Sequence, residues 1–211
     1  MFSLLRKIKV FSFFALVFLS TFNHATLYVM ATKGSYPGSN GLIAFSARDP
    51  SGTDFEIFIM NDDGTGVTQL TFNDVSDVDP CWSPDGEWIA FVSRIGDKEL
   101  IMAMRADGTG LRQVTDPPGE VNDERPAWSP DGEFILFYRP GDLSNDIYKV
   151  DPDILGSEVK LISDATSPSW SPDGSMIAYV TDESIWVADS NGTPQFQVTS
   201  DGRHPCWSPD G

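Results

Sequence analysis

The sequence contains few of the side chains that most often perform chemistry. Among its 211 residues there are two cysteines and two histidines, His24 and His204. A nucleophile needs a base within hydrogen-bond reach, and neither a Gly-x-Ser-x-Gly elbow nor a His-Glu-x-x-His pair occurs. We therefore expect a protein that is not an enzyme, with no catalytic residue and no cofactor.

Basic residues are also scarce, since 14 Lys and Arg stand against 31 Asp and Glu, for a formal net charge of −17. Binding to a phosphate backbone or to anionic headgroups relies on an excess of Lys and Arg. This balance argues against a nucleic-acid partner and against membrane contact beyond an export signal. The negative charge could keep an exported protein in solution or serve one cationic partner, and both explanations stay open.

One long apolar run, Val10–Leu19, follows three basic residues in a stretch without acidic side chains. This order is typical of a signal peptide, which we expect over residues 1–31 with cleavage near Ala31 or Ala25. An uncleaved membrane anchor over Val10–Met30 is the alternative, although polar residues near its end weaken it. In either case we expect the rest of the chain to lie outside the cytoplasm, secreted or periplasmic if the signal is cleaved and membrane-anchored if it is not.

The remaining residues, 32–211, are organised as internal repeats. The pentapeptide W-S-P-D-G occurs four times, and a Pro stands two residues before its Trp in every copy. The intervals between successive Trp residues are 46, 42 and 37 residues, a period typical of propeller blades and too long for leucine-rich or ankyrin units. The residues that define the repeat are Trp82, Asp85, Gly86, Trp128, Asp131, Gly132, Trp170, Asp173, Gly174 and Trp207.

Each unit contains four short apolar runs bounded by Gly, Pro, Asp or Asn, and such runs predict β-strands. Several are apolar at consecutive positions, as in Trp88–Val92 and Phe134–Tyr138. Consecutive apolar residues are expected in a small sheet that neighbouring sheets cover on both faces. We therefore predict an all-β protein, a β-propeller of four-stranded antiparallel blades.

The W-S-P-D-G signature itself predicts a hairpin turn, because Pro presets φ, Asp tolerates the third turn position and Gly supplies a positive φ. We expect the Asp to cap backbone N–H groups and the Trp to pack between blades. A residue that recurs in four copies favours a structural role over a catalytic or ligand-binding one.

The order of these elements resembles a known family. P-x-W-S-P-D-G-x-x-I-A-F, a D-G-T-G turn and x-Q-L-T recur in this order from about Ile43 to Gly211, and they are similar to the TolB-type branch of WD-like β-propeller repeats. The resemblance implies an extracytoplasmic propeller that serves as a protein-binding platform. A related propeller forms the N-terminal half of prolyl oligopeptidase and dipeptidyl peptidase enzymes. We expect this chain to contain neither the α/β domain that precedes the propeller in TolB nor a hydrolase domain.

The end segments decide how many blades the chain builds. Leu42–Ser46, Glu56–Met60 and Val67–Thr71 predict three strands of a first blade, and Arg203–Ser208 predicts a lone strand. The lone strand could complete the first blade, which would give three complete blades plus one shared between the chain ends. Because propellers of this repeat type usually close with six or seven blades, we favour a fragment of a larger ring. Such a fragment should be marginally stable or associate.

The chain has two cysteines, and export would permit a disulfide between them. Cys81 and Cys206 occupy the same repeat position, where Ala127 and Ser169 stand in the other copies. A bridge needs Cα atoms within about 7 Å, so these two can pair only if the last unit closes onto the first. We expect them to be two small buried residues that do not pair.

Loops that vary between copies indicate where a partner could bind. The W-S-P-D-G and D-G-T-G turns repeat at one end of the predicted ring, whereas the loops at the other end differ between copies. At this variable end, next to the channel mouth, the candidate partner-binding residues precede each Pro: Asp79, Arg125, Ser167 and His204. The alternative is that they are ordinary solvated loop residues.

Three functions remain open. The leading one is an exported scaffold for a protein or peptide partner. The alternative is the N-terminal gating propeller of an exported prolyl-oligopeptidase-type serine peptidase that lacks its catalytic domain here. A propeller lyase or glycan-binding protein is the third, and it would need functional residues at the ring centre. Asn61–Gly64 lacks the Glu and the alternating oxygens of a calcium loop, so we expect a hairpin turn there and no metal site.

Overall fold

The computed structural model describes residues 41–49, 52, 54–119, 121–141 and 144–211. The expected signal peptide, residues 1–31, and its cleavage sites near Ala25 and Ala31 lie outside the described residues. The described residues form strands, turns and loops, and they include no helix with the length and apolar character needed to cross a membrane. The prediction of an all-β protein is confirmed.

The strands form four antiparallel sheets in which consecutive strands are neighbours. The first sheet contains β1 (Ile43–Arg48), β2 (Phe55–Met60) and β3 (Thr68–Gln69). The second contains β4 (Asp77–Trp82), β5 (Trp88–Ile95), β6 (Lys98–Arg105) and β7 (Arg112–Gln113). The third contains β8 (Glu124–Trp128), β9 (Ile135–Pro140), β10 (Asn145–Val150) and β11 (Val159–Ile162). The fourth contains β12 (Thr166–Trp170), β13 (Met176–Thr181), β14 (Ser184–Asp189) and β15 (Pro194–Thr199).

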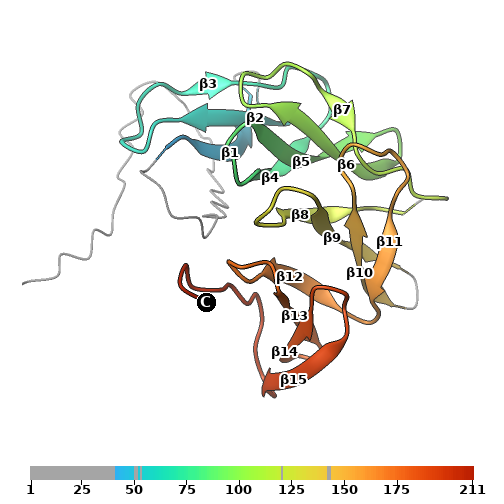
Figure 1. Cartoon of the computed structure of the whole chain (residues 1–211). Helices are drawn as coiled ribbons and strands as arrows, with labels where there is room; N and C mark the ends of the chain where they lie inside the picture. The colour runs from blue at the N-terminus through green and yellow to red at the C-terminus, as the bar shows by residue number, and fades with distance from the viewer. Residues whose placement is uncertain (1–40, 50–51, 53, 120, 142–143) are drawn as a thin grey trace, which may run out of the picture.

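Figure 1 shows the four sheets following one another round an arc, with β4, β8 and β12 on its inner side and β7, β11 and β15 on its outer side. Successive inner strands are in contact, since β4 packs on β8 and β8 on β12. Sheets that radiate in this way from a central channel are the blades of a β-propeller. The three complete four-stranded blades are present as predicted, and their first strands lie on the inner side of the arc.

The apolar core lies between the sheets. In β5, Ala90 and Val92 pack toward the third sheet, whereas Ile89 and Phe91 pack toward the first. Trp128 belongs to the cluster between the second and third sheets, and the signature Trp residues of the other complete blades lie against the corresponding clusters. Burying one large apolar side chain contributes about 1.5–3 kcal/mol. Each blade therefore depends on its neighbours, and the prediction that the Trp packs between blades is confirmed.

The signature turn is closed by its own side chains. Ser83 Oγ donates to Asp85 Oδ1 at 2.5 Å and accepts from the N–H of Trp88 at 2.9 Å. Asp85 Oδ1 also accepts from the N–H of Glu87 at 3.0 Å, and Gly86 adopts a φ of 73°. The same three bonds recur in Ser129–Phe134 and Ser171–Met176. The expected capping role of the Asp is confirmed.

The segment Arg203–Ser208 differs from its expectation, because it is not a strand. It lies against β12, where Trp207 Nε1 donates to the carbonyl oxygen of Ser169 at 3.1 Å. The strands that end in the other signature turns are β4, β8 and β12, and each pairs with the strand that follows its turn. Among the described residues no such strand follows Arg203–Ser208. Since it does not pair with β1 either, the first sheet has three strands in the described part of the chain, and no blade shared between the two ends forms there.

Candidate functional site

The four candidate residues share an unusual backbone conformation. Their φ angles lie between 52° and 54° at Asp79, Arg125, Ser167 and His204. This is the left-handed region, which residues other than Gly rarely adopt. In β4, β8 and β12 the pairing register shifts next to the candidate, which marks a β-bulge in each inner strand. Because a bulge re-aims a side chain at one point of a strand, each of these three candidates departs from the regular ladder.

Three of the candidates, from successive units, come together. Arg125 Nη1 donates to Ser167 Oγ at 3.3 Å and lies 3.4 Å from His204 Nδ1. Ser167 Oγ lies 3.5 Å from the same ring nitrogen. Arg125 and His204 are exposed, and Ser167 is half-buried. We call Arg125, Ser167 and His204 the inner-rim cluster.

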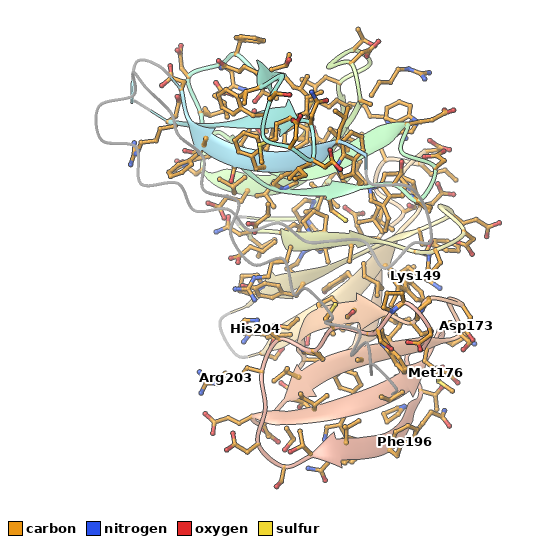
Figure 2. The ribbon with its side chains drawn as sticks, turned by 90° about the vertical axis from the view of Figure 1, so that its left-hand side faces the viewer. Lys149, Asp173, Met176, Phe196, Arg203 and His204 are labelled. Carbon is orange, nitrogen blue, oxygen red and sulfur yellow. The ribbon has the colours of Figure 1, made fainter. Side chains whose placement is uncertain are left out.

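The inner-rim cluster lies toward the variable end of the propeller. Figure 2 places His204 and Arg203 at one end of the sheets and Lys149, Asp173 and Met176 at the opposite end. Asp173 belongs to a W-S-P-D-G turn. The cluster and the repetitive turns therefore occupy opposite ends, and the cluster lies on the side where loops differ between copies.

Asp79 is close to the cluster but does not join it. It is half-buried, and among the described residues no ion pair links it to Arg125. Burial raises the pKa of Asp79, the positive charge of Arg125 opposes that increase, and the negative charge of Glu124 adds to it. The carboxyl group is therefore within electrostatic range of Arg125 without being in direct contact.

Two neighbours of the cluster, Glu124 and Tyr138, were not identified from the sequence. The hydroxyl of Tyr138 donates to the carboxylate of Glu124, and Arg125 Cζ lies 5.6 Å from the centroid of the Tyr138 ring. Burial, followed by the bond to Glu124 and its charge, raises the pKa of Tyr138 to about 12. Glu124 and Tyr138 are register partners in β8 and β9, and this register, which a β-bulge shifts, left no signal in the sequence.

A second candidate location is a hollow of about 320 Å³ beside the third sheet, lined by Val121, Arg139, Pro140, Gly141, Ser144, Asp146 and Tyr148. Its charged side chains already have partners. Arg139 binds Asp123 through two bonds, Nε to Oδ1 at 2.6 Å and Nη2 to Oδ2 at 3.1 Å. Lys160 Nζ binds Asp146 Oδ2 at 2.7 Å. The hollow therefore offers a ligand fewer uncommitted charged groups than the inner-rim cluster does.

The remaining chemical expectations concern metals and thiols. In the part of the chain that the structure describes, no group of three or more His, Cys, Asp or Glu side chains could hold a metal ion. Asn61–Gly64 forms the expected turn, with the N–H of Gly64 donating to the carbonyl of Asn61 at 3.0 Å. Cys81 and Cys206 are both free thiols. The expectation that both are buried is wrong for Cys206, which is exposed because its segment pairs with no strand, whereas Cys81 is half-buried.

Both the sequence and the fold of this chain are similar to those of TolB proteins. A family model described as the TolB beta propeller domain matches residues 24–211. The putative TolB of Agrobacterium tumefaciens aligns with a TM-score of 0.65 and 23% identity, over 81% of this chain and 68% of that one. TolB of Acinetobacter baumannii aligns with a TM-score of 0.63 and 22% identity, over 85% of this chain and 46% of that one. At these identities the structural likeness concerns the fold.

A curated relative connects the sequence to a peptidase. Dipeptidyl-peptidase 5 of Porphyromonas endodontalis is 35% identical over 101 residues. The match covers 45% of this chain and 15% of the relative. The similarity therefore concerns one segment of a much longer protein.

Proposed function

Because the chain belongs to the TolB β-propeller family, we propose that it is an exported scaffold that binds a protein or peptide partner at the variable end of the propeller. Export rests on the apolar run and the basic residues that precede it in residues 1–31. The partner is inferred from the surface of the propeller, since one propeller fold serves many functions.

The convergence of Arg125, Ser167 and His204 is the observation that carries this proposal. A non-Gly residue in the left-handed region costs on the order of 1–3 kcal/mol, and such residues cluster at functional sites. Here the same strained backbone recurs in successive units while the side chain changes from Asp to Arg, Ser and His. A constant backbone with exchangeable polar side chains is what a scaffold with an adaptable contact surface requires.

Exposed apolar residues near the same end support a polypeptide partner. Phe72, between β3 and β4, is 76% exposed, and Ile95, at the end of β5, is 47% exposed. Protein interfaces combine aromatic and apolar residues with a polar rim. The net charge of −17 disfavours a nucleic-acid partner because it would repel phosphates.

We propose that the contact between Ser167 and His204 serves binding and is not a catalytic pair. In a Ser–His–Asp triad, one ring nitrogen faces the nucleophile and the other faces an orienting carboxylate. In this chain Nδ1 of His204 faces both Ser167 Oγ and the guanidinium of Arg125. We therefore propose a binding site and not a hydrolytic one.

A second function is favoured by one specific observation, the 35% identity to dipeptidyl-peptidase 5 over 101 residues. In this alternative the propeller is the gate of an exported serine peptidase whose nucleophile lies in a separate domain. The reading frame downstream of the codon for Gly211 separates the two functions. A Gly-x-Ser-x-Gly motif followed by Asp and His would favour the peptidase, whereas further W-S-P-D-G repeats and a stop codon would favour the scaffold.

Binding measurements on the full chain test the scaffold proposal. We expect peptides selected from an immobilised array to bind at least about tenfold more weakly to Arg125→Asn and Phe72→Ser, as for central interface residues. Arg105→Asn is the matched control. Arg105 is exposed and, like Arg125, lies over an aromatic ring, with its Cζ 4.8 Å from the centroid of the Trp88 ring, but it belongs to the repetitive-turn end. Val67→Ser, at a residue 50% exposed beside a D-G-T-G turn, controls for lost apolar surface. If Arg105→Asn weakened peptide binding as much as Arg125→Asn, and Val67→Ser as much as Phe72→Ser, the proposed location would be contradicted.

A further inference from the structure

The guanidinium of Arg125 has no carboxylate partner of the kind that four other basic residues in the described part of the chain have. Direct ion pairs join four basic residues to acidic ones, in Arg112–Asp153, Arg139–Asp123, Lys160–Asp146 and Arg203–Glu183. Among the described residues no carboxylate lies within ion-pair distance of Arg125, although acidic residues outnumber basic ones by 31 to 14. Its contacts are a hydroxyl, an imidazole nitrogen and an aromatic ring.

Arg125 is nevertheless held in place from two sides. Its guanidinium lies over the Tyr138 ring, and Glu124 fixes that ring by accepting the hydroxyl proton in a hydrogen bond. On the other side, Nη1 donates to Ser167 Oγ. A guanidinium has five N–H donors in a rigid fork, so most of the donors of Arg125 remain uncommitted. An ordered fork with free donors is prepared for a planar anion, since less side-chain entropy is lost on binding.

Three polar atoms of the inner-rim cluster lie close together. Arg125 Nη1, Ser167 Oγ and His204 Nδ1 lie 3.3, 3.4 and 3.5 Å from one another. Each of the three can donate a hydrogen bond, and protonated His204 would add a positive charge. Exposed Arg125 and His204 leave the group open to the solvent.

We propose that the inner-rim cluster binds a carboxylate of the docked peptide, with Arg125 as the main ligand and Ser167 and His204 as supporting donors. This proposal rests on the proposed scaffold function and gives its site a chemical class. A carboxylate accepts two parallel N–H bonds from an Arg fork, which a backbone carbonyl cannot do. The carboxylate belongs either to the C-terminus of the peptide or to an Asp or Glu side chain.

The acidic surface of the chain does not prevent this binding. Exposed charges farther away than about 8 Å are largely screened at physiological ionic strength. The nearby carboxyl groups are Asp79, which forms no ion pair with Arg125, and Glu124, which accepts a hydrogen bond from Tyr138. The peptide carboxylate therefore approaches Arg125 from the side of Ser167 and His204.

The test uses the full chain and three N-acetylated pentapeptides without other charged groups. One has a free C-terminal carboxylate, the second is the same sequence amidated, and the third is the amidated sequence ending in Glu. We expect the first or the third to shift the NMR signals of Arg125 Nε–H and of the His204 ring, with affinity at least about tenfold above that of the second, because charge-assisted bonds are the stronger ones. The arm that binds identifies the source of the carboxylate.

Variants separate this inference from the scaffold function. Arg125→Asn should remove the preference for a carboxylate, since Asn tolerates the left-handed backbone but offers no fork, and Arg105→Asn should retain it. Equal binding of the amidated and free peptides, unchanged by Arg125→Asn but lost in Phe72→Ser, would overturn the carboxylate site and leave the scaffold function standing. Binding of no peptide, neither these three nor any from an array, would overturn both.

Discussion

Arg125 and His204 are 79 residues apart in the sequence, and Arg125 Nη1 lies 3.4 Å from His204 Nδ1. The two residues occupy equivalent positions two units apart, and Ser167 from the unit between them contacts both. The contact is long-range in sequence only because the intervening blades turn the chain round the channel. It therefore reports the packing of whole blades against one another, and changes that separate the blades should disperse the inner-rim cluster.

The left-handed positions should respond to side-chain branching at Cβ. Ser167→Val is expected to lower the free energy of unfolding by about 1–3 kcal/mol, because a β-branched residue is strained at positive φ. Ser167→Gly should be tolerated better, since Gly adopts this conformation without strain. Urea denaturation of both variants is the measurement. Thr166→Val, at the preceding position of β12, is the control and should have a smaller effect than Ser167→Val.

The Arg139–Asp123 pair should be more important for stability than an exposed pair. The Asp123 side chain is 0% exposed and that of Arg139 is 10% exposed, so Asp123→Asn would leave a nearly buried guanidinium without its main counter-charge. We expect a loss of about 3 kcal/mol or more in chemical denaturation. Glu183→Gln breaks a pair whose side chains are 70% and 73% exposed, and it should cost less than about 1 kcal/mol. Similar losses in both variants would contradict this ranking.

The signature turn should make a contribution to stability that depends on pH. Bonds from Ser171 and from the N–H and hydroxyl of Ser175 lower the pKa of Asp173 from 3.8 to about 2. Since the folded pKa is the lower one, this contribution is fully present above the ordinary pKa of Asp and is lost as the pH falls from about 4 to about 2. Asp173→Asn should therefore lower the melting temperature at pH 7, and the difference from the unmodified chain should shrink toward pH 2. A constant difference would exclude this linkage.

The two thiols should differ in reactivity. Burial raises the pKa of Cys81 to about 11, and the thiolate is the reactive form, whereas Cys206 is exposed. In the folded chain at pH 8, iodoacetamide should modify Cys206 first, and Cys81 should react at a comparable rate only after denaturation. Mass spectrometry of the digested protein measures both sites. Faster labelling of Cys81 in the native state would argue against its buried environment.

The repeat sequence was sufficient to predict most of the fold. W-S-P-D-G specifies a turn through interactions within six residues, and the apolar runs between the turns specify strands buried on both faces. The recurring Gln and Thr of x-Q-L-T also have structural roles. Thr71 Oγ1 accepts from the N–H of Ile57 at 2.9 Å, and Gln69 Nε2 donates to the carbonyl of Thr71 at 2.8 Å; the same bonds recur at Thr115 and Gln113. Arg203–Ser208 was predicted as a strand from its likeness to the other copies. Likeness was insufficient there, because a strand also needs a partner to pair with.

The candidate site was predictable in part. The four residues before Pro were selected by their repeat position, and the residue before a Pro is indeed biased away from the right-handed helical region. The contact of Arg125 with His204 could not be deduced, since it depends on the angle between successive blades. The bond between Tyr138 and Glu124 depends on strand register, which the β-bulge in β8 shifts between Glu124 and Ala127.

The signature turns also bear on how the gene can change by duplication. The side-chain bonds of Ser83, Asp85 and their counterparts stay within their own hairpin. A duplicated unit therefore brings its own turn intact, and the loss of a unit leaves the other turns unchanged. Duplication or loss of whole units can therefore lengthen or shorten such a protein without any change in the sequence of its hairpin turns. Only the surfaces between adjoining units must then adapt, and selection can act on the residue that each new copy presents at the channel.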